Sequence, residues 1–275
     1  KFETLKDESG KEIGKVRNFN GRNSIKLKKM RRYVDIDVLD VSFKLLQQFG
    51  QRPGNLQKLY IENIDIENGL IKRWVSGEGP KAKGGPHQNV NLRDINPELW
   101  KKIEKLVLRA KAEGVTTGPL LKTHFVDTSI TGKGSSYNRH TSAIWGKNTK
   151  AKEKYLSSDL LHAIRYITGN PKIEPYSFRT AIETTGREID ALIKKGDLKS
   201  PDLKDSQGVP FTIESWKHFV DTAIVRHKVG VGEQYYSRYT HEQINIGMKK
   251  FQELRYKAHD LSLIHISEPT RQAEI

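Results

Sequence analysis

The chain has 275 residues and no cysteine, and this absence excludes several kinds of chemistry. Disulfide bonds, thiolate nucleophiles and cysteine-ligated metal sites are ruled out, because each requires a residue that the chain does not have. The lack of cysteine favours a reducing compartment. The length allows one large domain or two small ones.

Long apolar runs and two familiar binding motifs are also missing. No apolar run approaches the roughly 20 residues that a spanning helix requires, so we expect no membrane-spanning segment. The 9 histidines show no H-E-x-x-H or comparable spacing, which disfavours a metal hydrolase. The stretch "GEGPKAKGG" lacks the G-x-x-x-x-G-K-[ST] pattern and lies between expected strands, so a nucleotide-binding loop is a weak alternative.

Positive charge is what the chain has in excess. Lysine and arginine number 48 against 33 aspartates and glutamates, which gives a net charge of +15 and an isoelectric point near 9.7. A surplus of this size attracts polyanions such as nucleic acid or an anionic membrane surface. We therefore expect a polyanionic partner.

The spacing of apolar residues predicts a mostly helical chain with one small sheet, which is an α+β fold. Alternation on both sides of a Gly/Pro/Lys-rich tip within residues 64–92 predicts antiparallel strands joined by a turn. Residues 195–211 are expected to be a polar insertion loop, and 129–150 a loop followed by a short helix. Helices are expected over residues 26–49 (one or two), 55–62, 97–113, 157–168, 177–194, 212–226 and 233–258.

Both ends of the chain differ in character from its middle. The sequence begins at Lys1 without methionine, in a polar stretch that carries no signal-peptide pattern. The last stretch, "LSLIHISEPTRQAEI" (261–275), resembles the translation of a transposase-type sequencing adapter. We expect the chain to be a metagenomic-style fragment of a longer protein, and we leave this tail out of the fold prediction.

Arg52 stands in a tight turn, "GQRPG", between two apolar helical segments. A guanidinium in such a turn is costly to bury unpaired, so it should face a carboxylate or an external anion. Comparable cationic groups are Lys81 and Lys83 at the strand turn and Arg179 in the first turn of a later helix. Taken singly, each has an ordinary structural explanation as an ion pair or a solvated charge.

The order of these residues along the chain resembles that of the tyrosine recombinase or phage integrase family. The stretch "FGQRPGNLQKLYIENIDIENG" resembles the first arginine box of that family, and "KAKGGPHQNVNL" resembles the strand pair that carries its lysine. The stretch "YSFR" resembles the second box, and "RHKVGVGEQYY" resembles the last. The resemblance covers roughly residues 30–250.

The resemblance implies a role for each matched residue. Arg52 and Arg179 would neutralise charge on the phosphate, and Lys83, with Lys81 as the alternative, would be the general acid. The resemblance matches Tyr176 to the first position of the second box.

The last box supplies the histidine and the nucleophile. His227 and Tyr176 would hydrogen-bond the phosphate or assist proton movement. The implied nucleophile is Tyr236, with Tyr235 as the alternative and Tyr239 as a weaker third choice.

The implied activity is site-specific DNA integration or recombination: cleavage and rejoining through a 3′-phosphotyrosyl intermediate, with no metal and no cofactor. The implied partner is double-stranded DNA, bound by a homotetramer, in the cytoplasm of a bacterium and associated with the nucleoid; the gene would belong to a phage or another mobile element. Residues 26–260 would form the catalytic domain. Residues 1–25 would be a polar lead-in or linker from a missing N-terminal core-binding domain.

Three features depart from the family pattern. Asn55 stands where the family has an acidic residue, Tyr176 replaces the usual histidine or lysine, and the gap from Arg179 to His227 is unusually long. A phenol can donate a hydrogen bond to a phosphate oxygen but carries protons poorly near neutral pH. Asn55 and Tyr176 keep one alternative open, a non-catalytic DNA-binding protein with a decayed recombinase site.

Overall fold

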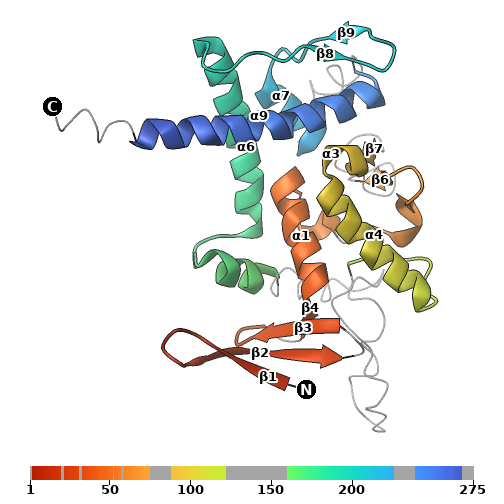
Figure 1. The fold of residues 1–275 in the computed structure, drawn as a ribbon, viewed down its shortest axis with the longest axis vertical. Helices are drawn as coiled ribbons and strands as arrows, with labels where there is room; N and C mark the ends of the chain where they lie inside the picture. The colour runs from red at the N-terminus through yellow and green to blue at the C-terminus, as the bar shows by residue number, and fades with distance from the viewer. Residues whose placement is uncertain are drawn as a thin grey trace, which may run out of the picture.

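A computed structural model of the chain describes residues 2–19, 22–30, 33–51, 53–56, 59–74, 88–121, 160–225 and 239–267, and the structural statements below refer to these residues. Within them, helices are packed together with small antiparallel sheets (Figure 1). The expected mixture of helices and antiparallel strands is confirmed.

The N-terminal segment forms an antiparallel sheet that reaches into the stretch where a helix was expected. Its strands lie in chain order: β1 (Phe2–Lys6), β2 (Glu12–Phe19), β3 (Arg22–Leu27) and β4 (Val34–Asp35). The expected helix is therefore wrong for residues 26–30 and 33–35. Apolar residues of β3 and β4 alternate with polar ones and share one face, and Ile25 pairs directly with Val34. Figure 1 shows this sheet at the N-terminal end of the first helix.

Helix α1 (Ile36–Phe49) follows β4 without a loop. Asp35 caps it, because its Oδ1 accepts a hydrogen bond of 2.8 Å from the backbone N–H of Asp37. The same carboxyl group accepts a hydrogen bond from Arg109. The helix ends at Gly50, which adopts the left-handed conformation with φ 55°.

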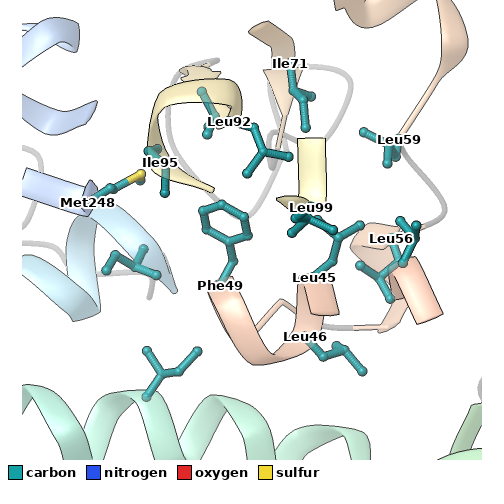
Figure 2. Packing of buried hydrophobic residues seen from close by; sticks show 14 of the residues in the cluster. Leu45, Leu46, Phe49, Leu56, Leu59, Ile71, Leu92, Ile95, Leu99 and Met248 are labelled. Atoms are coloured by element: carbon teal, nitrogen blue, oxygen red, sulfur yellow. The ribbon is translucent and has the colours of Figure 1, made fainter. Parts of the chain in front are cut away.

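The central core lies between α1 and a small three-stranded sheet. That sheet contains β5 (Ile64–Asp65), β6 (Leu70–Trp74) and β7 (Gln88–Asn91), which confirms the antiparallel strands expected there. Figure 2 shows side chains from several elements pointing toward one another: Leu45, Leu46, Phe49, Leu56, Leu59, Ile71, Leu92, Ile95, Leu99 and Met248. Core residues therefore lie on both sides of Arg52 in the sequence, Phe49 before it and Leu56 after it.

Short helices link this sheet to the rest of the first half. The helix expected at 55–62 is instead the four-residue α2 (Pro53–Leu56) and, after Leu59 and Tyr60, the 3₁₀-helix η1 (Ile61–Asn63). Helices α3 (Leu92–Ile95) and α4 (Pro97–Ala112) follow β7, and α4 confirms the helix expected over 97–113.

The second half is mainly helical. Residues 160–168 are helical, and they are followed by α6 (Pro175–Lys195), as expected. The expected insertion loop contains a hairpin of β8 (Leu203–Lys204) and β9 (Pro210–Phe211). Helix α7 (Trp216–Phe219) continues as a π-helix, η3 (Val220–Ile224), and α9 (His241–Ser267) is last. The loop and helix expected at 129–150 lie outside the described residues.

Helix α9 runs further than expected and across α6. It confirms the final helix from His241 onward and continues into the stretch that resembles an adapter translation. Figure 1 shows α9 crossing α6, and the two helices are in contact. Among the described residues, no helix combines the length and the apolar character that crossing a membrane requires.

Helices α6 and α9 both contact α7. Asp190 of α6 accepts hydrogen bonds from Ser215 Oγ (2.8 Å), Trp216 N (2.7 Å) and Lys217 N (3.1 Å), so it caps α7 from a neighbouring helix. On the other side, a Cβ at Gly247 of α9 would come within 2.5 Å of the Phe219 ring. These contacts fix where the π-helix begins.

The cap at Asp35 gives a first prediction. Asp35→Ala removes the N-cap acceptor and should lower the free energy of unfolding by about 1–2 kcal/mol. Asp35→Asn should cost less than half of that amount, because an asparagine oxygen still accepts from Asp37 and Asp35 is a buried carboxylate that is costly to desolvate. Urea unfolding of both variants measures the difference. Equal losses would mean that the ion pair with Arg109 matters more than the cap.

The same carboxyl group predicts a pH dependence. Burial raises the pKa of Asp35 above its ordinary value, against the attraction of Arg109. The folded state therefore binds the proton more tightly than the unfolded state does, and the stability gained from protonation is lost as the pH rises through the raised pKa. Asp35→Asn cannot titrate, so its stability relative to the parent should improve as the pH rises through that window.

Candidate active site

The second box begins helix α6. The backbone N–H of Glu174 donates to Ser177 Oγ at 3.1 Å, and Pro175 occupies the first turn, where it loses no intrahelical hydrogen bond. Tyr176 is 51% exposed, whereas Arg179, one turn later, is only 2% exposed. The helix therefore presents a phenol at the surface and holds a guanidinium in the interior.

Arg179 is paired within its own helix. Its Nε lies 3.1 Å from Oε1 of Glu183, four residues further on, and the Glu183 side chain is 17% exposed. The attraction between these opposite charges offsets part of the cost of burying the guanidinium. Sequence reasoning did not single out Glu183, although its i,i+4 spacing from an arginine on a predicted helix was the signal that could have found it.

The turn before Arg52 packs directly on the backbone of Arg179. A Cβ added to Gly50 would lie 3.0 Å from Arg179 Cα and 3.1 Å from Val225 Cγ1. Gly50 stands two residues before Arg52, and Val225 stands two residues before His227. Residues of the first and second boxes and the segment just before the last box therefore meet at this glycine.

A hydrogen bond also joins the first box to the segment just before the last box. Gln51, which is 1% exposed, donates from Nε2 to the backbone oxygen of Ile224 at 3.2 Å. Its Oε1 accepts from Nδ2 of Asn55 at 3.0 Å. The residue immediately before Arg52 is thereby tied to the π-helix that leads toward His227.

Helix α9 holds the end of α1 from the opposite side. Gln252 Nε2 donates to the backbone oxygen of Gln48 at 3.2 Å, and Arg255 Nη1 donates to that of Gln47 at 2.6 Å. These bonds satisfy carbonyl groups at a helix end, where no intrahelical partner is available. Burial lowers the pKa of Arg255 below its ordinary value. The helix that follows the candidate tyrosines thus fixes the helix that precedes Arg52.

The remaining candidate residues divide into two groups. Tyr239 is described: its hydroxyl donates to the backbone oxygen of Thr212 at 2.7 Å, and its ring meets Phe211 edge to face, so it links the segment just before α9 to the end of β9. The others lie outside the described residues: Arg52, Lys81, Lys83, His227, Tyr235 and Tyr236. Of the six principal candidates, the structure therefore describes Tyr176 and Arg179 and the immediate neighbours of Arg52.

Within the described part of the chain, no group of three or more His, Asp or Glu side chains could hold a metal ion. The arrangement places the cation of Arg179 on α6, close to Gly50, which leads to Arg52, and close to Val225, which leads to His227.

Comparisons of the chain with protein-family models, with curated proteins and with solved structures gave no match. The interpretation of the site therefore depends on its own residues and contacts.

Close packing at Gly50 gives a prediction with an internal control. Gly50→Ala should lower the free energy of unfolding by about 2–4 kcal/mol, since it combines left-handed strain with crowding against Arg179, Ile182 and Val225. Gly196→Ala is the control: Gly196 ends α6 in the same left-handed region, with nothing within 4 Å of an added Cβ. It should show the strain alone, about 1–2 kcal/mol. Equal losses in denaturant unfolding would contradict the close approach.

Proposed function

We propose that this chain is the catalytic domain of a site-specific DNA recombinase of the tyrosine type. The observation that carries the proposal is the meeting point at Gly50, where Arg179 and the residues leading to Arg52 and His227 come together. These segments are far apart in the sequence, yet they are the ones that the family resemblance selects. If the two arginines had no common role, nothing in the sequence would lead us to expect the segments that carry them to pack together.

The chemistry assigns each group a task. A tyrosine hydroxyl, that of Tyr236 or Tyr235, attacks the scissile phosphorus in line, passes its proton to His227 and forms a 3′-phosphotyrosyl bond. The P–O5′ bond breaks, and the leaving oxygen takes a proton from Lys83 or Lys81. In rejoining, a 5′-hydroxyl returns its proton to that lysine and attacks the phosphorus, and the released tyrosine oxygen takes its proton back from His227. Nothing is oxidised or reduced, and no energy donor is consumed.

The arginines stabilise the charge that develops on the non-bridging phosphate oxygens. Arg179 suits this task because a guanidinium remains charged at all relevant pH values. It is 2% exposed in the chain without DNA, so the proposal includes its exposure to the phosphate when DNA binds. Arg52 would supply the second guanidinium from the neighbouring turn.

The net charge of +15 supports a DNA substrate. Most of this charge would contact backbone phosphates, so binding should weaken steeply with added salt. As part of the proposal, the enzyme acts as a tetramer on two duplexes, since each of the four strands that are cut needs its own nucleophile. The proposal also places the enzyme in the cytoplasm.

The second candidate is a DNA-binding protein that has lost catalysis. It is favoured by Tyr176, an exposed phenol at a position that should carry a proton-transferring group. It predicts salt-sensitive DNA binding and no covalent adduct.

Adduct formation tests the proposal without knowledge of the target site. We expect the full chain, mixed with supercoiled plasmid and a chelator and then quenched with detergent, to give relaxed DNA and a tyrosine peptide that carries nucleotide mass. Tyr236→Phe should abolish the adduct at nearly unchanged DNA affinity. If the adduct persists, Tyr235→Phe identifies the alternative nucleophile. No adduct from the parent chain, with DNA binding retained, would favour the second candidate.

Arg179→Ala should reduce the rate of adduct formation by about 10²–10³-fold, since one preoriented donor to the developing charge is lost. Arg187→Ala is the matched control, because Arg187 is an exposed arginine on the same helix and its loss removes the same formal charge. Thermal unfolding of both variants checks that the fold survives. Comparable adduct rates in the two variants would rule out the assigned role of Arg179.

A further inference from the structure

A buried side-chain amide connects the first box of the candidate site to the segment just before the last box. Gln51 lies between Asn55, which donates to its oxygen, and the carbonyl group of Ile224, which accepts from its nitrogen. The direction of donation is the same along the whole chain of bonds: Asn55 to Gln51 to Ile224. We call these three groups the amide relay.

Among the described residues, the carbonyl of Ile224 takes its hydrogen bond from outside its own helix. Ile224 is the last residue of the π-helix and is 2% exposed. A buried carbonyl group without a hydrogen bond costs free energy comparable to a lost bond. Gln51 supplies the donor from a position 173 residues away in the sequence.

This carbonyl sets the polarity of the whole relay. A carbonyl oxygen can only accept, so the nitrogen of Gln51 must face it, and the oxygen of Gln51 must face residue 55. Residue 55 must then donate. An asparagine can do so, whereas an ionised aspartate or glutamate only accepts and would set oxygen against oxygen.

We infer that Gln51 and Asn55 are positioning residues that fix the Arg52 turn on the segment leading to His227, and that residue 55 must be a hydrogen-bond donor for this purpose. The inference rests on the proposed function for its catalytic part. It also gives a reason for Asn55, which the family resemblance counts only as a departure.

The test uses an isosteric change that reverses one hydrogen-bonding role. Asn55→Asp turns the donor into an acceptor, and Asn55→Ala removes the donor without adding charge. Asn23→Asp is the control, because Asn23 Oδ1 already accepts from Asn18 Nδ2 at 2.8 Å and an aspartate keeps that role. All three variants are made in the full chain.

Stability is measured first, without DNA, by urea unfolding from roughly pH 5 to about pH 8. A protonated carboxyl group donates, so Asn55→Asp should restore the relay at low pH. Its folded-state pKa is then raised, and stability relative to the parent is lost as the pH rises through that pKa. Across the range, its unfolding equilibrium constant should rise about tenfold relative to that of the parent. Asn55→Ala and Asn23→Asp should stay parallel to the parent.

Adduct formation is then measured over the same range, as the ratio of each variant to the parent. We expect the ratio for Asn55→Asp to fall about tenfold between low and high pH, and the ratios for the two other variants to stay flat. A merely structural role would leave the ratio flat once the folded fraction is accounted for. Flat ratios for all variants would overturn the positioning role.

Two failures can be told apart. If the parent forms no adduct, the proposed function fails and the catalytic part of the inference fails with it, whereas the stability series still decides whether residue 55 donates. If the parent forms an adduct and Asn55→Asp behaves like Asn23→Asp in both series, the relay is wrong and the proposed function stands.

Discussion

The contact between the end of α1 and the first turns of α6 determines where the other parts of the candidate site can lie. Gly50 has no Cβ and adopts a left-handed conformation, so the chain can turn at a point where Arg179 Cα is within 3.0 Å of the place that a Cβ would take. Helix α9 ties the preceding carbonyl groups, and α6 caps α7 through Asp190. Each of these bonds fixes one segment relative to this contact.

Charge serves two separate purposes in this molecule. Inside, Arg179 lies against Glu183, because a buried guanidinium without a carboxylate would be too costly. Outside, the lysine and arginine surplus acts over about 10 Å at ordinary salt and attracts a polyanion without fixing its position. Attraction and positioning are therefore carried by different residues, so changes in salt should affect binding more than the geometry of the buried pair.

Local sequence patterns predicted the elements whose stability is local. Helix α4 was readable because Leu99, Ile103 and Leu106 recur at helical spacing after Asn96, which caps the helix. The N-terminal sheet was missed because its apolar residues are few, and their burial depends on pairing between strands. The bond from Gln51 to Ile224 has no local signal at all, since it exists only after distant segments have packed.

Departures from a motif also have to be judged by contacts that form only when distant segments pack together. In the sequence, Asn55 counts against an intact site because it is not acidic, but its value depends on what it faces. It faces the oxygen of Gln51, whose nitrogen is committed to a buried carbonyl group, so an acidic residue would be the poorer choice here. Tyr176 has no such compensation, since its ring is exposed at the start of α6. The argument for a decayed site therefore now depends on Tyr176 alone, because the hydrogen bonds give Asn55 a structural reason of its own.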